Sequence, residues 1–256
     1  MRVLLTNDDG IYAEGLMALA EEISRVGEVV VVAPDRPRSA SGHAITLHKP
    51  LRLTRALMAG GREGYATNGT PSDCVVMGVH GLLGGEKPNL VISGINAGPN
   101  LGEDLTYSGT VSAAMEGTLF GIGSFAISVA SYEVPDFGPA ARFAVRLAQV
   151  LCEHPLPDDT FLNVNVPALP AHQIAGVVVT RQGRRRYEER LERRIDPGGK
   201  EYFWVGGDLY EEPPHSGTDV EAVAQDKISI TPIQLDLTNY QLLEELPRWL
   251  LPGLEA

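Results

Sequence analysis

Cysteine and long apolar runs are the scarcest features of this 256-residue chain. Its two cysteines, Cys74 and Cys152, form no CxxC pair and lie in apolar stretches, where a reduced thiol packs as a small hydrophobic group. The opening MRVLLTNDDG has too short an apolar run for a signal peptide, and no later run approaches the roughly 20 residues of a membrane span. These absences predict a cytoplasmic protein with no membrane partner.

Positively charged residues are also few. The chain has 21 Lys and Arg against 33 Asp and Glu, a formal net charge of −12. Sequence-independent binding of duplex nucleic acid needs a broad basic face, so that function is excluded. Residues 181–194, RQGRRRYEERLERR, are locally basic. This segment is either a solvated, self-paired face or a guide for an anionic substrate or partner.

Several well-known catalytic motifs are missing. The chain has no HExxH, GxSxG, GxxxxGK[ST] or GxGxxG pattern, which argues against zinc proteases, serine hydrolases, P-loop NTPases and standard dinucleotide enzymes. Its composition, 43% hydrophobic and 21% charged, is that of an ordinary globular protein. The length favours one large domain or two intimately joined domains.

Apolar runs typical of buried strands alternate with helical periodicity over residues 1–160. Expected strands cover residues 3–6, 29–33, 90–93 and 125–130, and expected helices cover residues 16–26, 70–83, 110–120 and 143–151. Thr70-Pro71-Ser72-Asp73 reads as a capping box at one helix start. This alternation predicts an α/β fold with a Rossmann-like, doubly wound, mainly parallel sheet, which would form the catalytic core.

The pattern of apolar and polar residues changes after residue 160. Short alternating segments such as FLNVNV, GVVVT and KISITPIQL are separated by loops rich in charge, Gly and Pro, which predicts a smaller β-rich extension over residues 161–256. Thr238 to Gln241 reads as a second capping box, which opens a short C-terminal helix that Pro247 should stop.

Ligands of doubly wound folds bind beyond the carboxyl ends of the strands, so the loops there are the candidate sites. The first such loop, NDDG, offers Asp8 and Asp9, and paired carboxylates suit a hard cation such as Mg²⁺ or Mn²⁺. The same residues are also common in turns and helix caps. The second loop, PDRPRSASG, offers Ser39 and Ser41, with His43 just beyond. Taken alone, these residues are explained more simply by a polar turn and by a surface or satisfied core histidine.

A third loop, SGINAGPNLG at residues 93–102, contributes Asn96 and leads to an expected helix start at YSGTV. Free backbone N–H groups and the positive end of the helix dipole make such a start an anion site. Ser108 and Thr110 offer hydroxyl donors there. One glycine loop before a helix is a weak signal, but several such loops at one sheet edge indicate a ligand site.

The segments named above resemble the SurE family, the survival-protein-E nucleotidases. The similarity is carried, in the family's order, by NDDGI, APDRPRSASG, GTPSDCV, SGINAGPNLG, YSGTVSAAMEG and GTDVEAVAQDKISITPIQLDLT, which together span most of the chain. The resemblance implies a divalent-metal-dependent phosphatase that acts on nucleoside 5′- and 3′-monophosphates, with some action on short polyphosphate. It also implies a homodimer or homotetramer that exchanges C-terminal elements, here residues 181–250.

The resemblance further implies roles for single residues. One divalent ion per subunit, Mg, Mn or Co, would be held by Asp8, Asp9, Ser39 and Asn96. Asn96 and the helix start at Ser108, Gly109 and Thr110 would bind phosphate, and Ser41 and His43 would add substrate contacts. Asp8 and Asp9 would be catalytic, since they hold the metal and either one orients the water that the metal activates.

Two alternatives stay open at this point. A haloacid-dehalogenase-type phosphatase is suggested by the loose similarity of residues 7–11 to DxDG[TV], although that mechanism needs an aspartate where this chain has Asn7. A non-catalytic nucleotide-binding sensor would use the same anion site. Turnover with added metal separates the sensor from either enzyme.

Overall fold

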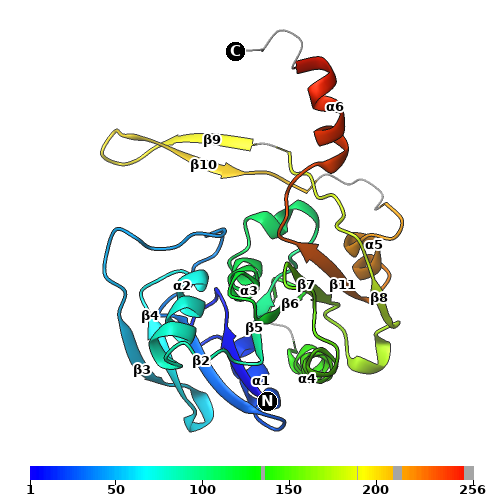
Figure 1. The fold of residues 1–256 in the computed structure, drawn as a ribbon. Helices are drawn as coiled ribbons and strands as arrows, with labels where there is room; N and C mark the ends of the chain where they lie inside the picture. The colour runs from blue at the N-terminus through cyan, green and yellow to red at the C-terminus, as the bar shows by residue number, and fades with distance from the viewer. Residues whose placement is uncertain (134–135, 189, 210–214, 251–256) are drawn as a thin grey trace.

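The computed structural model describes residues 1–133, 136–188, 190–209 and 215–250, so the expected end of the extension, 251–256, lies outside them (Figure 1). The strands are β1 (Arg2–Thr6), β2 (Glu28–Pro34), β3 (Leu53–Leu57), β4 (Glu63–Thr67), β5 (Leu90–Ala97), β6 (Gly123–Val129), β7 (Thr160–Val166), β8 (Val177–Val179), β9 (Arg190–Ile195), β10 (Glu201–Gly206) and β11 (Ile228–Gln234). The α-helices are α1 (Glu14–Ile23), α2 (Pro71–Val76), α3 (Gly109–Leu119), α4 (Gly138–Glu153), α5 (Asp219–Ala224) and α6 (Tyr240–Leu250). Shorter helical segments are Ala59–Gly61, Met77–Leu82, Gly102–Thr106 and Ala171–Gln173.

Nine strands form one sheet in the order β3-β4-β2-β1-β5-β6-β7-β11-β8. The run from β4 to β7 is parallel throughout, while β3 and β11 are antiparallel to their neighbours β4 and β7. The predicted α/β fold with a mainly parallel, doubly wound sheet is therefore confirmed. The strand order reverses between β1 and β5, where ligands of such sheets bind.

Helices cover both faces of this sheet. Val3 and Leu5 of β1 pack in a core with α1 and α4, whereas Leu4 between them packs in a second core with α2 and α3. Successive side chains of a strand point to opposite faces, so the two helix pairs lie on opposite sides. Because both faces are covered, the central strands are continuous apolar runs.

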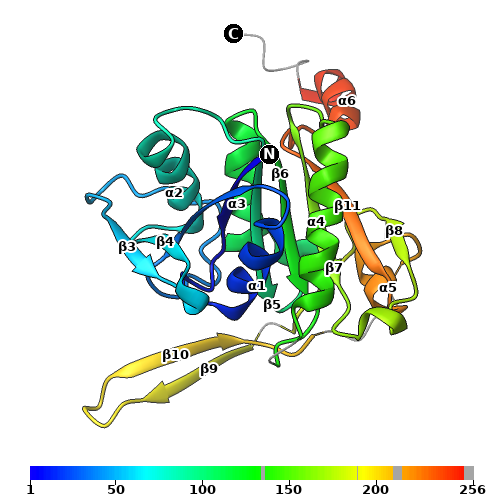
Figure 2. The same ribbon diagram turned by 90° about the horizontal axis from the view of Figure 1, so that it is seen from below.

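The expected C-terminal extension has two parts. Strands β7, β11 and β8 complete the main sheet, while β9 and β10 form a separate antiparallel hairpin. Figures 1 and 2 show this hairpin and α6 projecting from the body of the protein. Pro232 is tolerated in β11 because β8 pairs only with residues 228–230, so the proline faces no second neighbour.

The helix expected through Leu83 is confirmed to Leu82, although it is α-helical only to Val76 and continues as a π-helix over Met77–Leu82. Two predictions for the C-terminal helix were wrong. Asn239, not Thr238, caps α6, because its Oδ1 accepts a hydrogen bond from the backbone N of Leu242 at 2.9 Å. Pro247 lies inside α6 and does not stop it, since the φ of proline suits a helix and only one hydrogen bond is lost.

The hairpin of β3 and β4 was not predicted. Its turn includes Gly60 at a φ of +72°, a region that favours glycine, and most of its side chains are exposed or half-buried. The capping box at Thr70 is confirmed. Among the described residues no helix combines the length and hydropathy that crossing a bilayer requires.

Candidate active site

The turn after β1 is fixed by its first residue. Asn7 is fully buried, and its amide group both accepts from the backbone N of Gly10 and donates to the backbone O of Gly10, each at 3.1 Å. Gly10 has a φ of +102°, which a residue with a side chain rarely adopts. This turn places Asp8 and Asp9 at the carboxyl end of β1.

Asp8 is the more enclosed of the two carboxylates, with 6% of the residue exposed. Its Oδ1 accepts a hydrogen bond from the Thr110 hydroxyl of α3, and its backbone O accepts one from Arg38 N at 2.7 Å. Burial raises the pKa of Asp8 to about 6; the charge of Asp9 adds to this, and the Thr110 hydroxyl opposes it. Asp8 thus joins the serine-bearing loop and the start of α3.

Asp9 connects the first loop to β5. Its Oδ2 accepts a hydrogen bond from Ala97 N at 3.4 Å, and burial raises the pKa of Asp9 against the effect of that hydrogen bond. Asn96 precedes Ala97, and its Nδ2 donates to Gly98 O at 2.8 Å, so Oδ1 is the amide atom that can ligate a cation. The exposed Ser39 follows Arg38, whose N contacts Asp8.

The start of α3 closes the other side of the site. The Ser108 hydroxyl accepts from Val111 N at 3.1 Å, so it caps the helix, and its proton can still be donated to a substrate. Gly109 allows a close approach, because a Cβ there would lie 2.7 Å from Asp8 Cβ and 2.9 Å from Ser41 Oγ. The helix therefore begins one residue before the expected Thr110 and directly against the carboxylates.

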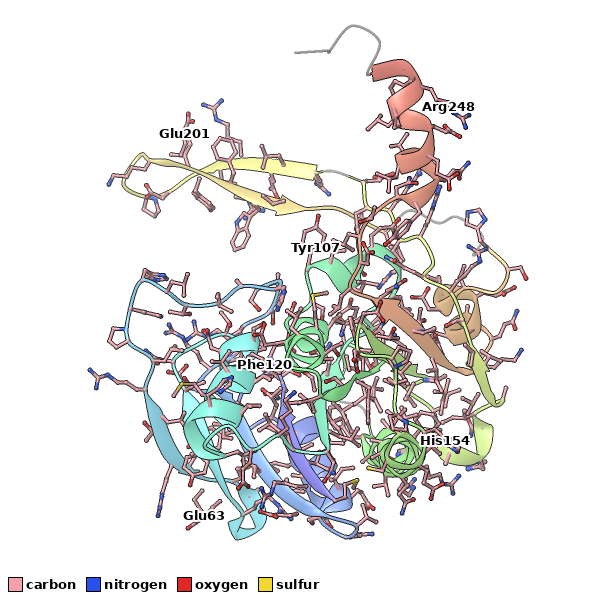
Figure 3. The ribbon with its side chains drawn as sticks, in the orientation of Figure 1. Glu63, Tyr107, Phe120, His154, Glu201 and Arg248 are labelled. Carbon is pink, nitrogen blue, oxygen red and sulfur yellow. The ribbon has the colours of Figure 1, made fainter. Side chains whose placement is uncertain are left out.

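The serine loop, residues 35–52, has little regular structure but many anchors. Gly42 N donates to Tyr107 O at 3.0 Å, and His43 Nε2 lies 2.7 Å from Glu116 Oε2 on α3. In the view of Figure 3 Tyr107 lies above α3, which is seen there nearly end-on. Between these anchors, Ser41 Oγ is buried without a hydrogen-bond partner in the described part of the chain. An unsatisfied buried hydroxyl beside a helix start is a candidate ligand contact.

Asp73 anchors the far end of the same loop. Its two carboxylate oxygens accept from the backbone N and hydroxyl of Thr46 at 2.9 and 2.6 Å, while one of them also accepts from Thr70 N at 2.8 Å. The Thr70 hydroxyl accepts from Asp73 N and donates to Ala44 O at 2.7 Å. The capping box of α2 therefore also holds the serine loop.

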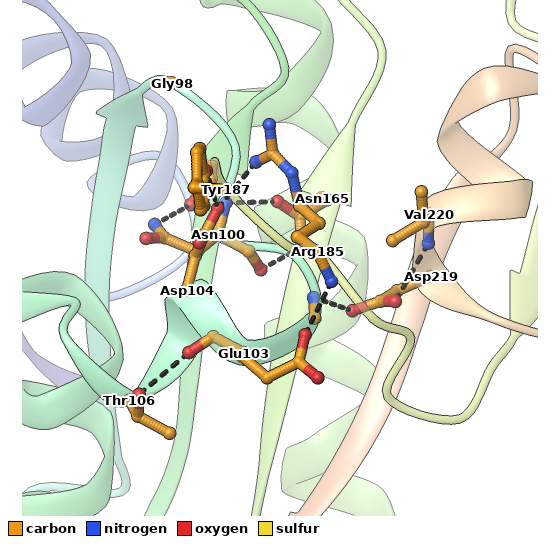
Figure 4. Close-up of polar contacts among 12 residues, drawn as sticks. Gly98, Asn100, Glu103, Asp104, Thr106, Asn165, Arg185, Tyr187, Asp219 and Val220 are labelled. Atoms are coloured by element: carbon orange, nitrogen blue, oxygen red, sulfur yellow. Dashed lines mark hydrogen bonds and ion pairs between the residues drawn. The ribbon is translucent and has the colours of Figure 1, made fainter. Parts of the chain in front are cut away.

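A buried polar network supports the third loop (Figure 4). Asn100 N donates to Asn165 Oδ1 at 2.9 Å, and Asn100 O accepts from the amide groups of Asn163 and Asn165. Asn100 Nδ2 donates to Ser128 Oγ at 2.7 Å. Asparagines in the otherwise apolar FLNVNV strand were the sequence signal for this network, which was not recognised.

Asp219 and the basic segment reinforce this loop from the C-terminal half. The fully buried Asp219 accepts from Gly102 N at 2.9 Å and from Gly183 N at 2.7 Å, and burial raises its pKa. Arg185 pairs with Asp104 at 2.7 Å, and the Tyr187 hydroxyl donates to the same carboxylate. These contacts, drawn in Figure 4, dock residues 181–188 against the turn that leads into α3.

The residues present fit a divalent cation. No cluster of three or more His, Cys, Asp and Glu side chains suited to a metal occurs within the described ranges, so a cation here would combine two carboxylates with neutral oxygens, a donor set that hard ions accept. The Arg38 guanidinium donates to Asn68 O and Asp35, not to the site carboxylates. The buried Asp8 therefore has a charge that a cation would compensate.

Comparisons with known proteins agree with this geometry. The family model described as "Survival protein SurE" matches residues 3–189. A "5'-nucleotidase SurE" of Geotalea uraniireducens is 53% identical over 97% of this chain and 99% of its own length. The protein of the same name from Thermosynechococcus vestitus is 52% identical over 98% and 97%. The crystal structure of the SurE protein from Aquifex aeolicus superposes with a TM-score of 0.84 at 44% identity, covering 97% of this chain and 99% of that one.

Proposed function

The chain belongs to the SurE family and is a phosphoric monoester hydrolase of the nucleotidase type, and from this premise we propose that it is a metal-dependent enzyme that hydrolyses nucleoside 5′- and 3′-monophosphates and short polyphosphate. The observation that carries the proposal is the convergence of Asp8, Asp9 and the start of α3 at the carboxyl edge of the sheet. Both cysteines are free thiols, which supports a cytoplasmic setting.

Asp8, Asp9, Ser39 and Asn96 would hold one Mg, Mn or Co ion per subunit. Such an ion supplies positive charge at the phosphoryl group and lowers the pKa of a bound water. The buried Asp8 is kept in place by Thr110, whose hydroxyl donates to it. Asp9 is kept in place by the Ala97 N–H. Either carboxylate is then positioned to orient the attacking water and accept its proton.

The start of α3 is the proposed phosphate site, together with the side chain of Asn96. The backbone N–H groups of Gly109 and Thr110 belong to the first helical turn, which lacks acceptors within the helix, and the helix dipole favours an anion there. The Ser41 hydroxyl, buried beside Gly109 without a partner in the described residues, can donate to a phosphate oxygen. His43, held by Glu116, fixes the loop that carries Ser41.

Direct attack by water is favoured over a phosphoaspartyl intermediate. The position of the nucleophile in the haloacid dehalogenase motif is taken by Asn7, whose amide group hydrogen-bonds to both backbone polar groups of Gly10. Water then attacks phosphorus, the bond to the nucleoside oxygen breaks, and that oxygen takes up a proton. Acid quenching during a single turnover should therefore trap no phosphoprotein.

We also propose a homodimer or homotetramer that exchanges the hairpin β9–β10 and α6. Support comes from apolar side chains that the single chain leaves exposed, including Phe203 and Trp204 of β10 and Leu243 of α6. Large exposed apolar patches mark interaction surfaces in soluble proteins.

The test is phosphate release from a panel of 5′- and 3′-nucleotides and short polyphosphates, each with Mg²⁺, Mn²⁺ or Co²⁺ and with chelator. Hydrolysis of nucleoside monophosphates that chelation abolishes is expected. Tight nucleotide binding without turnover under every metal condition would support the sensor instead, and a stoichiometric phosphoprotein at Asp8 or Asp9 would support the dehalogenase-type route.

A further inference from the structure

A small pocket opens beside Asp9 at the point where the strand order reverses. It has a volume of about 200 Å³, and its walls include Asp9, Ala13, Ala97, Tyr132 and Phe137. Asp9 and Ala13 follow β1, Ala97 ends β5, and Tyr132 and Phe137 follow β6, so the pocket lies at the crevice between β1 and β5 where doubly wound sheets bind ligands. We propose that this pocket binds the nucleobase of the substrate, with Tyr132 as its stacking platform; the inference rests on the proposed function.

Tyr132 has the geometry of a stacking platform. It is 76% exposed, yet its ring is fixed against the loop after β5, because a Cβ on Gly98 would lie 2.6 Å from the ring. Only a glycine at that position lets the ring lie so close to the backbone two residues after Asn96. An exposed aromatic ring held by backbone on one side leaves its other side for a base, and such stacking tolerates any base.

The opposite wall is apolar and close-packed. Phe137 is 9% exposed, and its ring lies where a Cβ on Gly15 would be 3.0 Å away. Drug-sized ligands occupy pockets of roughly 300 Å³ or more. The smaller volume here fits one ring system and not a whole nucleotide, so the phosphate must lie outside it.

Charge fixes the orientation of the substrate. Glu14 and Glu133 also line the pocket, and with Asp9 they make it unfavourable for a phosphate. Carboxylates accept hydrogen bonds, and nucleobases offer N–H donors. The phosphate site at α3 lies on the other side of the carboxylate pair, because Thr110 contacts Asp8 while Asp9 lines the pocket. A monophosphate therefore spans the carboxylates with its base at Tyr132.

The experiment compares AMP with ribose 5-phosphate, which has the same phosphate ester but no base. Hydrolysis kinetics and calorimetric affinity would be measured for the full chain and for the variants Tyr132→Ala, Tyr132→Phe, Ala13→Leu and Tyr107→Ala. Ala13→Leu narrows the same pocket, and Tyr107 is a second exposed tyrosine, located at the start of α3.

Tyr132→Ala and Ala13→Leu should each reduce the preference for AMP over ribose 5-phosphate by about tenfold, through KM, with little change for ribose 5-phosphate. Tyr132→Phe should keep the preference, since stacking needs no hydroxyl, and so should Tyr107→Ala. An unchanged preference in Tyr132→Ala, or a preference lost in Tyr107→Ala, would overturn the proposal. If the unmodified chain hydrolyses neither compound, the proposed function fails, while the calorimetric affinity ratio still decides whether the pocket binds a base.

Discussion

Two regions of the molecule distribute polar and apolar groups in opposite ways. One is the carboxyl edge of the main sheet with its loops, the loop edge, and the other is the projecting part formed by β9, β10 and α6. At the loop edge, polar residues such as Asp8, Asn100 and Asp219 are buried and hydrogen-bonded. In the projecting hairpin, Trp204 is 61% exposed and Val205 is 86% exposed. These polar groups of the first region find hydrogen-bond partners within the chain, whereas the second region presents a surface that burial against another chain would stabilise.

The largest expected effect on catalytic activity comes from substitutions at the loop edge. Asp8→Asn and Asp9→Asn keep the side-chain shape but remove charge needed to hold a divalent cation, so kcat/KM should fall roughly a thousandfold, several kcal/mol of transition-state stabilisation. Initial rates of phosphate release over a range of AMP concentrations, at fixed Mn²⁺, measure kcat and KM. Oligomer mass should not change. Full activity of both variants after exhaustive chelation would rule out the metal site.

A smaller loss of kcat/KM is expected from a substitution at the start of α3. Thr110→Ala removes the hydroxyl that donates to Asp8 and shortens a side chain of the phosphate site. A hydrogen bond to a charged group contributes about 1.5 to 3 kcal/mol, so kcat/KM should fall roughly 10- to 100-fold. Thr118→Ala, which removes a buried hydroxyl later in the same helix, is the matched control. Kinetics of a folded Thr110→Ala protein equal to those of the unmodified chain would remove Thr110 from the site.

Stability should respond to pH through Asp8. Its pKa of about 6 in the folded protein lies above the ordinary value, so the folded state binds the proton more tightly and is favoured at low pH. This contribution is lost as the pH rises through about 6, which amounts to about 1 kcal/mol between about pH 5 and pH 7.5. Urea unfolding of metal-free protein at both values should show the loss in the unmodified chain but not in Asp8→Asn. An equal pH response in the two proteins would contradict the assignment.

The smallest effect on the core is expected from truncation of the projecting part. Deletion of residues 238–256 removes α6 but leaves the main sheet, because β11 ends at Gln234. Light scattering should show smaller assemblies, and circular dichroism should show a retained α/β core. An identical mass before and after truncation would contradict the proposed exchange.

Much of the fold, and of the arrangement of residues at the loop edge, was predictable from the sequence, because the sequence signals are local. Buried parallel strands such as β1 and β5 are apolar runs, and the parallel order alone brings Asp8, Asp9 and Asn96 to one edge. The capping box at Thr70 is likewise encoded within four residues. These features depend on the adjacent sequence more than on distant partners.

The remaining features depend on distant contacts. The hairpin of β3 and β4 is mostly exposed, so it lacks the apolar alternation that marks a half-buried strand, and it forms because β4 can pair with β2. The role of Asp219 arises from backbone N–H groups at residues 102 and 183, which no spacing in the sequence connects. The partner of His43 is Glu116, 73 residues away.

The double use of Asp73 has a consequence for hydrogen exchange. Because one carboxylate caps α2 and also accepts from the backbone N of Thr46, opening of the serine loop and fraying of the first turn of α2 should occur together. The amide protons of Thr46, Thr70 and Asp73 should then exchange with one shared opening free energy. The serine loop would open as a single unit with the helix, not residue by residue.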